Sequence, residues 1–129
     1  MGEHAPEVER TFVALDSPTG HVNGAGFHPC QGVWYWAAGR RPRVGVISTH
    51  YAVDFSEHYL APLLAARGLG FLGWNTRFRN NESWFVLEHA LVDVGAGVRW
   101  LREVAGRQFA QGVGQAQAAR RAQRGLGRL

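Results

Sequence analysis

The sequence predicts one α/β domain, and three observations lead to that prediction. The chain has 129 residues, of which 46% are hydrophobic, and this suits a single globular core. Two short apolar runs, at residues 44–48 and 69–74, flank a segment with helical periodicity, which is the pattern of a β-α-β unit. A second amphipathic segment follows between residues 84 and 104.

A β-hairpin is expected at the start of the folded part. Residues 1–10 carry no apolar run, so we predict a flexible N-terminus there. Residues 11–15 are strand formers, the composition of residues 16–20 is typical of a turn, and residues 21–27 predict a returning strand. Residues 33–37 predict a third short strand.

The segment 44–74 predicts a right-handed β-α-β crossover. The apolar run at 44–48 is continuous, as in strands that are buried on both faces of a parallel sheet. Asp54 can cap the following helix because Glu57 stands three residues later, at capping-box spacing. Gly68 ends this helix, and the second buried strand follows directly at 69–74.

The last predicted element is an amphipathic helix over roughly residues 84–104. Its apolar residues recur every three or four positions: Leu87, Leu91, Val94, Val98, Leu101 and Val104. Gly95 and Gly97 each cost a helix about 1 kcal/mol relative to alanine. We therefore expect both glycines to be explained by close packing against a neighbour.

Residues 106–129 differ in composition from the rest of the chain. They carry five arginines and no acidic residue, whereas residues 1–105 carry nine arginines and ten acids. We predict a disordered or partly helical tail. An acid-free run of Ala, Arg, Gly and Gln is also what a GC-rich gene yields out of frame, so we hypothesise a frameshift near codon 106.

Three segments between residues 11 and 105 resemble the N-terminal portion of the α/β-hydrolase superfamily. Residues 44–50 are similar to its strand that ends in a His-Gly turn, residues 57–68 to the next helix, and residues 74–77 to a strand that ends in an Asp-x-Arg-Gly loop. The helix that contains Asp93 looks like the one that precedes the nucleophile strand. The resemblance implies a partial α/β-hydrolase-like domain at 11–105.

The resemblance also implies a chemistry, which is serine-dependent hydrolysis of small ester-type substrates. In this family the turn after the first of these strands supplies a backbone N–H to the oxyanion hole, which indicates Tyr51 or Ala52, next to His50. The alternative is that His50 only hydrogen-bonds the turn. Asn75 and Arg77 lie where α/β sheets place ligands, and Arg77 either meets an anionic group or braces the loop.

By this resemblance, the sequence lacks the nucleophile, the acid and the base of the catalytic triad. The family's nucleophile stands in Gly-x-Ser-x-Gly, but none of the four serines lies between glycines at that spacing: Ser17, Ser48, Ser56 and Ser83. We therefore predict no catalytic residue in this chain and no hydrolase activity, although its relatives by resemblance are enzymes.

We expect neither a cofactor nor a metal. His50 precedes the predicted helix, Asp54 is used as its cap, and the neighbours Glu57 and His58 point about 100° apart on a helix. Cys30 is the only cysteine, which excludes an internal disulfide and gives no zinc motif.

The remaining expectations concern location and partners. No run of about 18 apolar residues predicts a membrane span, and we expect a cytoplasmic protein. A half-built sheet would expose apolar surface and favour self-association. The alternative function is a small non-catalytic α/β protein whose basic tail binds an acidic partner or nucleic acid, although no nucleic-acid motif accompanies the arginines.

Overall fold

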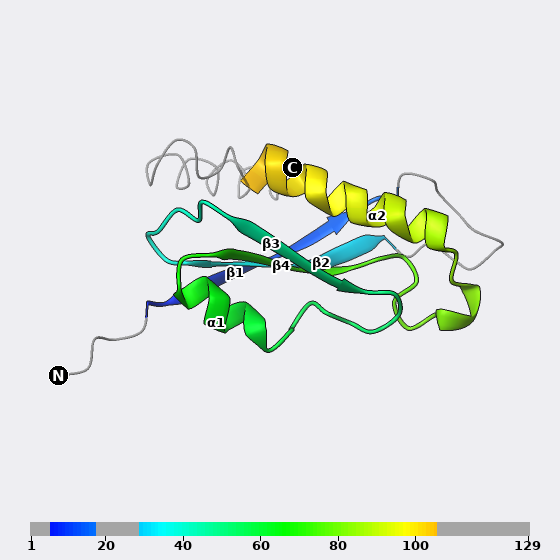
Figure 1. Ribbon diagram of the computed structural model, residues 1–129, viewed down its shortest axis with the longest axis horizontal. Helices are drawn as coiled ribbons and strands as arrows, with labels where there is room; N and C mark the ends of the chain where they lie inside the picture. Colours follow the sequence, from blue (N-terminus) through cyan, green and yellow to red (C-terminus); the bar gives the residue numbers. More distant parts are fainter. Residues whose placement is uncertain (1–5, 18–28, 106–129) are drawn as a thin grey trace, which may run out of the picture.

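The described part of the protein folds as a mixed four-stranded sheet with helices on both faces (Figure 1). The computed structural model describes residues 6–17 and 29–105. Within them lie the strands β1 (Val8–Leu15), β2 (Cys30–Ala37), β3 (Gly45–His50) and β4 (Gly70–Asn75), in the order β1-β2-β4-β3. β2 is antiparallel to β1 and β4, and β3 is parallel to β4. The predicted α/β class is thus confirmed.

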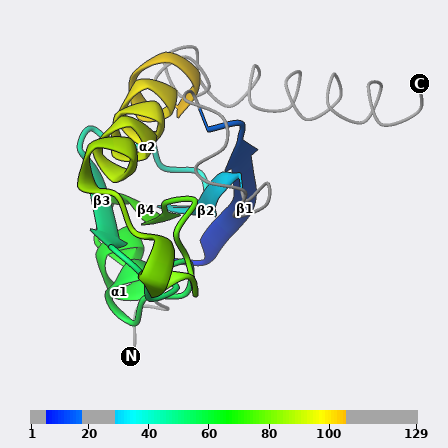
Figure 2. The same ribbon diagram turned by 90° about the vertical axis from the view of Figure 1, so that its right-hand side faces the viewer.

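Two helices cover opposite faces of this sheet (Figures 1 and 2). The short helix α1 (Leu60–Ala66) lies on one face, where its two buried alanines pack near Tyr35 and Phe71. On the other face lies α2 (Leu87–Trp100), which is preceded by a 3-10 turn at Glu82–Trp84 and continues as a π-helical turn at Leu101–Ala105. No helix among the described residues has both the length and the apolar character that a bilayer crossing requires.

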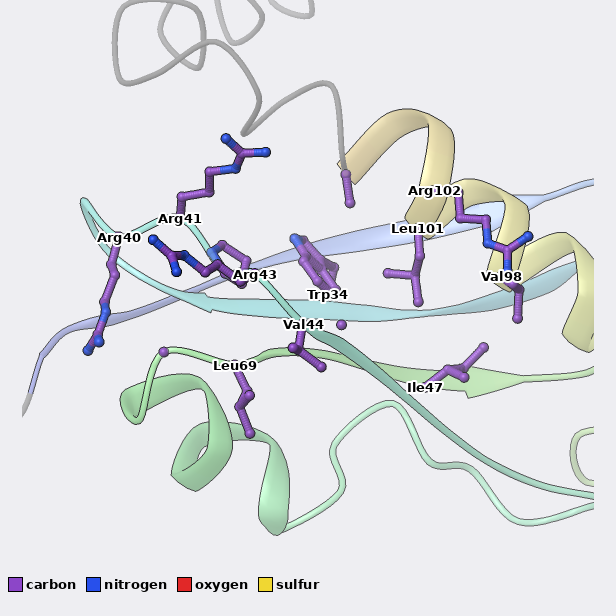
Figure 3. A pocket seen from close by; sticks show the side chains of 14 residues that line it. Trp34, Arg40, Arg41, Arg43, Val44, Ile47, Leu69, Val98, Leu101 and Arg102 are labelled. Atoms are coloured by element: carbon purple, nitrogen blue, oxygen red, sulfur yellow. The ribbon is translucent and has the colours of Figure 1, made fainter.

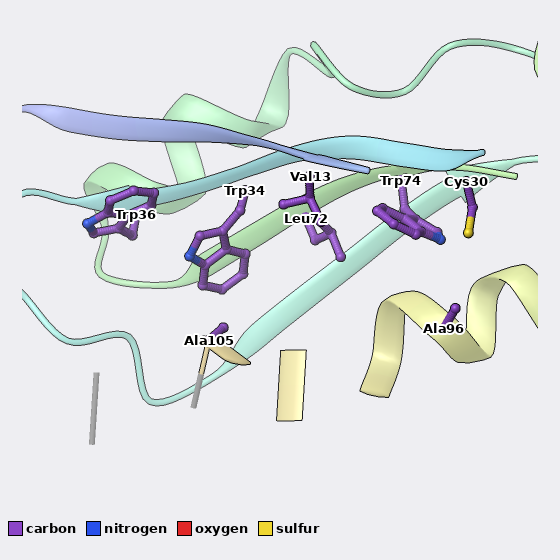
Figure 4. Packing of buried hydrophobic residues seen from close by; sticks show 8 residues of the cluster. All are labelled: Val13, Cys30, Trp34, Trp36, Leu72, Trp74, Ala96 and Ala105. Carbon is purple, nitrogen blue, oxygen red and sulfur yellow. The ribbon is translucent and has the colours of Figure 1, made fainter. Parts of the chain in front are cut away.

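The larger core lies between the sheet and α2, where side chains from β1, β2 and β4 point to the same side (Figure 4). Trp34 and Trp74 are the largest of its fully buried side chains. Trp34 also lies directly over Gly70 of the neighbouring strand β4, where a Cβ atom would overlap the indole ring. The sheet and the α2 layer are therefore fitted around two tryptophans.

Among the described residues, β1 pairs with the strand that was predicted as the third one. The returning strand expected at residues 21–27 lies outside the described residues, and so does the tail at 106–129. β1 pairs with β2, from Val8 opposite Ala37 to Leu15 opposite Cys30. The third strand predicted at 33–37 is therefore the second strand of the hairpin, and it begins earlier, at Cys30.

The prediction that the run at 44–48 is buried on both faces was wrong. Its strand, β3, lies at an edge of the described sheet, and Gly45 and Thr49 are exposed. β4 is the strand in which every residue is buried. Both runs are equally continuous in the sequence, and only strand order decides which of them has neighbours on two sides.

The helix of the crossover begins later than predicted. Asp54 does not cap it, because α1 starts at Leu60, and the carboxylate of Asp54 instead accepts the backbone N–H and the hydroxyl of Ser56. Residues 51–59 form a loop across the end of β4. The end of the helix agrees with prediction, since Gly68 follows it with φ 90°, a conformation that favours glycine.

Helix α2 buries a different stripe from the predicted one. The buried residues are small or polar, namely Ala90, Asp93, Ala96 and Gly97. Leu87 and Leu91 are 56% and 61% exposed. Close packing is confirmed at Gly97, where a Cβ atom would lie 2.9 Å from the Trp74 ring, but not at Gly95, where it would meet only the Arg99 side chain at 3.4 Å. The small residues let the helix approach the sheet closely. With this face of the helix on the sheet, the two leucines are left exposed.

Candidate functional site

The predicted site residues come together at the carboxyl ends of two neighbouring strands of the sheet. β3 and β4 run parallel and end side by side, with His50 in register with Asn75. The loops that follow, at residues 51–59 and 76–86, therefore lie at the carboxyl ends of two parallel strands, where α/β sheets usually place ligands. The site can be described through three groups: the His50 turn, the Asn75 amide and the Arg77 guanidinium.

His50 organises the turn that follows β3. Its Nδ1 accepts hydrogen bonds from the backbone N–H groups of Ala52 (3.1 Å) and Val53 (2.9 Å), which requires a neutral ring with Nδ1 unprotonated. The ring also stacks on Tyr51, with 4.4 Å between centroids. His50 therefore holds the turn, and the Ala52 amide is directed to the imidazole.

Tyr51 is exposed and reaches an acidic side chain. Its hydroxyl donates to Glu82 Oε1 at 3.0 Å, which links the His50 turn to the 3-10 turn before α2. This hydrogen bond and the charge of Glu82 raise the pKa of the Tyr51 phenol above its usual value. The phenol is therefore neutral at physiological pH.

Asn75 connects the end of β4 to the loop after β3. Its Oδ1 accepts the N–H of Phe55 at 2.7 Å, and its Nδ2 donates to Asp54 Oδ1 at 2.9 Å. Partial burial acts to raise the pKa of Asp54, but hydrogen bonds from Ser56 and Asn75 and the charge of Arg79 outweigh it, so the pKa lies below its usual value. The amide of Asn75 is thus used to hold the loop.

Arg77 forms a buried ion pair with Asp93 of α2. The Arg77 side chain is 6% exposed and that of Asp93 is fully buried. Asp93 Oδ2 accepts the backbone N–H and the Nε–H of Arg77, both at 2.9 Å, and Oδ1 accepts from Nη2 at 2.7 Å. The guanidinium therefore braces the loop after β4 against α2, which was the second of the two roles considered for it.

The four residues weighed as metal ligands do not gather. The Glu57 side chain is 79% exposed and points to Arg10, at 3.7 Å. His58 Nδ1 accepts the N–H of Leu60 at 3.2 Å, and its ring stacks on Tyr59. In the part of the chain that the structure describes, no group of three or more His, Cys, Asp or Glu side chains could hold a metal ion.

Sequence reasoning missed two buried polar groups beside this site. Asp93 was noted only as part of a resemblance, although its place between Ala90 and Gly97 on one helical stripe signals a face that packs closely. Cys30 Sγ donates to the Leu15 carbonyl at 3.4 Å. Burial, with a contribution from the charge of Asp93, raises the pKa of the Cys30 thiol to about 11.

A large pocket lies elsewhere, along β3 and toward its amino-terminal end (Figure 3). Its volume is about 1090 Å³. Trp34, Ile47 and Leu101 give it an apolar lining, and four arginines stand around it: Arg40, Arg41, Arg43 and Arg102. It therefore does not include the predicted site residues.

Comparison of the chain with family models, with curated proteins and with solved structures gave no match.

Proposed function

We propose that residues 8–105 form the N-terminal part of an α/β-hydrolase-like domain whose chemistry is serine-dependent hydrolysis of esters. The observation that supports this best is the topology. β1, β4 and β3 run in one direction and β2 runs in the other, in the order β1-β2-β4-β3. The first four strands of an α/β-hydrolase sheet have this order and these directions.

The loop at residues 51–59 has the position of the oxyanion-side loop in that family. α/β-hydrolases take one oxyanion N–H from the loop between the third strand and the first helix. Here that loop connects β3 to α1. Because the Ala52 N–H is directed to His50, we assign the oxyanion role to the Tyr51 amide. In acyl transfer it would stabilise the charge that develops on the carbonyl oxygen.

The nucleophile would come from a further strand, paired with β3. No Gly-x-Ser-x-Gly occurs in the 129 residues, so the proposal assigns no hydrolase activity to this chain alone. If the frameshift hypothesis is correct, another reading frame after codon 105 encodes this strand and the missing motif. The chain would then supply the turn and the loops that surround a serine it does not carry.

Two measurements test this proposal. The purified chain should neither hydrolyse p-nitrophenyl butyrate nor be labelled by a fluorophosphonate probe beyond a heat-denatured control, and labelling of any of its serines would contradict the proposal. The nucleotide sequence should encode the motif in one of the other two frames within some twenty codons. If neither frame does so, the frameshift hypothesis is wrong.

A chain rebuilt with that continuation tests the role of the turn. It should react with the fluorophosphonate, and its Ser→Ala variant should not. In the rebuilt chain Tyr51→Pro removes one oxyanion N–H and should lower kcat by about 10²–10³-fold, whereas Tyr51→Phe keeps the amide and should not. Equal effects of the two variants would exclude the Tyr51 amide.

The second candidate function is binding of an acidic partner or nucleic acid through the arginine-rich residues 106–129. It is favoured by the charge of that segment, with five arginines and no acid. A filter-binding assay in rising salt, on the whole chain and on one cut after residue 105, separates the two candidates. Binding that is salt-sensitive and lost on truncation would support this function.

A further inference from the structure

The outer edge of β3 offers unpaired backbone groups. Within residues 6–17 and 29–105, β3 pairs on one side only, with β4. The N–H of Gly70 donates to the carbonyl of Val44 at 2.8 Å, so alternate residues from Val44 onward turn their backbone groups to β4. The residues between them, Gly45, Ile47 and Thr49, turn theirs to the open edge. An added strand would pair with these three.

An apolar flank of α2 overhangs the same edge. Next to the stripe that packs on the sheet, and about 100° around the helix from it, runs a second stripe. It consists of Leu87, Leu91, Val94, Val98 and Leu101. Val98 and Leu101 line the pocket that borders Gly45 of β3, and Leu91, farther along the stripe, is 61% exposed. Sheet edge and helix flank together leave room for another element.

We propose that a second copy of this chain occupies this edge, with the two β3 strands antiparallel around a two-fold axis. The register that uses all three outward residues places Ile47 opposite Ile47 of the partner subunit and Gly45 opposite Thr49 of the partner subunit. Two four-stranded sheets then become one continuous sheet. This inference does not require the proposed hydrolase relationship.

The position of α2 fits this arrangement. A Cβ atom on Gly97 would lie 2.9 Å from Trp74 of β4 and 3.0 Å from Ile47 of β3, so α2 lies above the space between these strands. Neighbouring strands are about 4.8 Å apart, so α2 lies half that distance inside β3 and the two-fold axis lies half that distance outside β3. The two α2 axes are therefore roughly 10 Å apart, which is within the distance at which helices pack. The exposed leucines of one copy would then cover those of the other.

Charge selects the antiparallel direction. Three arginines precede β3 within residues 40–43. At the other end of the strand lie Asp54, which is already paired with Arg79 at 3.5 Å, and the acidic Glu82, 3.0 Å from the Tyr51 hydroxyl. Antiparallel pairing brings each arginine segment beside the acidic end of the partner subunit, whereas parallel pairing would bring the arginines together. A second copy therefore complements this surface in hydrogen bonding and charge.

Sedimentation equilibrium of the full chain over the micromolar range tests the proposal. We expect a reversible monomer–dimer equilibrium. Leu91→Arg should weaken the dimer by about tenfold or more, because it buries a charge between the two helices. Phe12→Arg is the matched control, since Phe12 is 63% exposed but lies on β1, at the opposite edge of the sheet, and its dimer should dissociate as the wild type does.

A second variant pair tests the strand itself. Thr49→Pro removes an outward N–H while leaving the bonds between β3 and β4, and it should also weaken the dimer at least tenfold, whereas Thr49→Val should not. Circular dichroism confirms that each variant is folded. A monomer at all concentrations, a polydisperse aggregate, or a dimer weakened by Phe12→Arg but not by Leu91→Arg would overturn the proposal. These outcomes concern assembly, so they are distinguishable from a failure of the fluorophosphonate test.

Discussion

Replacing Asp93 by asparagine removes the anion that neutralises a buried guanidinium. In the folded protein the two carboxylate oxygens accept three hydrogen bonds from Arg77, at 2.7–2.9 Å. Asparagine keeps the size of the side chain, but its single oxygen cannot replace both acceptors and its amide N–H groups would face the guanidinium. Arg77, 6% exposed, would then carry an uncompensated charge in the interior.

Breaking a buried ion pair in this way costs about 3–5 kcal/mol, out of a total folding free energy of about 5–15 kcal/mol. For a domain of this size, such a loss lowers Tm by about 12 °C or more. The exposed pair between Arg79 and Asp54, at 3.5 Å, is the control. Arg79→Met should cost no more than about 1 kcal/mol, because solvent screens that pair.

Urea unfolding followed by tryptophan fluorescence measures these changes, since Trp74 is fully buried in the core beside α2. The double variant Arg77→Met/Asp93→Leu keeps the test informative if Asp93→Asn does not fold. It removes both charges together, so it should be more stable than either single substitution, although the Arg77 N–H loses its acceptor. A loss below about 1 kcal/mol for Asp93→Asn, or a double variant no more stable than the singles, would refute the argument.

Three further predictions follow from the packing and the pKa values. Gly95→Ala should raise stability by up to about 1 kcal/mol in thermal melts, while Gly97→Ala should lower it because its Cβ would lie 2.9 Å from the Trp74 ring. The Cys30 thiol should react with Ellman's reagent only after unfolding. Because the pKa of this thiol is raised from 9.0 to about 11, its contribution to stability is complete below pH 9 and is lost as the pH rises toward 11. Thermal melts at rising pH will show this loss. The pKa of Asp54 is lowered, so its contribution is lost as the pH falls below 3.8, and acid titration of Asp54→Asn should show a smaller loss than the wild type.

The crossover could be predicted because its signals are local. Two continuous apolar runs become β3 and β4, at Gly45–His50 and Gly70–Asn75, and Gly68 ends the helix between them. The start of that helix could not be predicted in the same way. Asp54 has capping-box spacing, but its carboxylate accepts from the Asn75 amide, a residue 21 positions away. Sequence spacing does not reveal that a residue far away in the chain will bind the Asp54 carboxylate in the folded protein.

The position of the site could be predicted from the sequence, but its side-chain contacts could not. The rule that parallel strands end at one edge placed His50 and Asn75 together, and they lie in register. That Arg77 meets Asp93 depends on the rotation of α2, and the leucine spacing predicted the wrong face. The helix turns its small residues inward because contact with the Trp74 ring leaves no room for larger ones.

The indole of Trp34 over Gly70 makes these two positions depend on each other across the β2–β4 pair. A methyl group added at position 70 would overlap the ring, so any larger residue there requires a smaller one at position 34. Related chains should therefore show paired substitutions, with tryptophan at the first position only where glycine stands at the second. Such covariation would identify other chains that build this sheet in the same way.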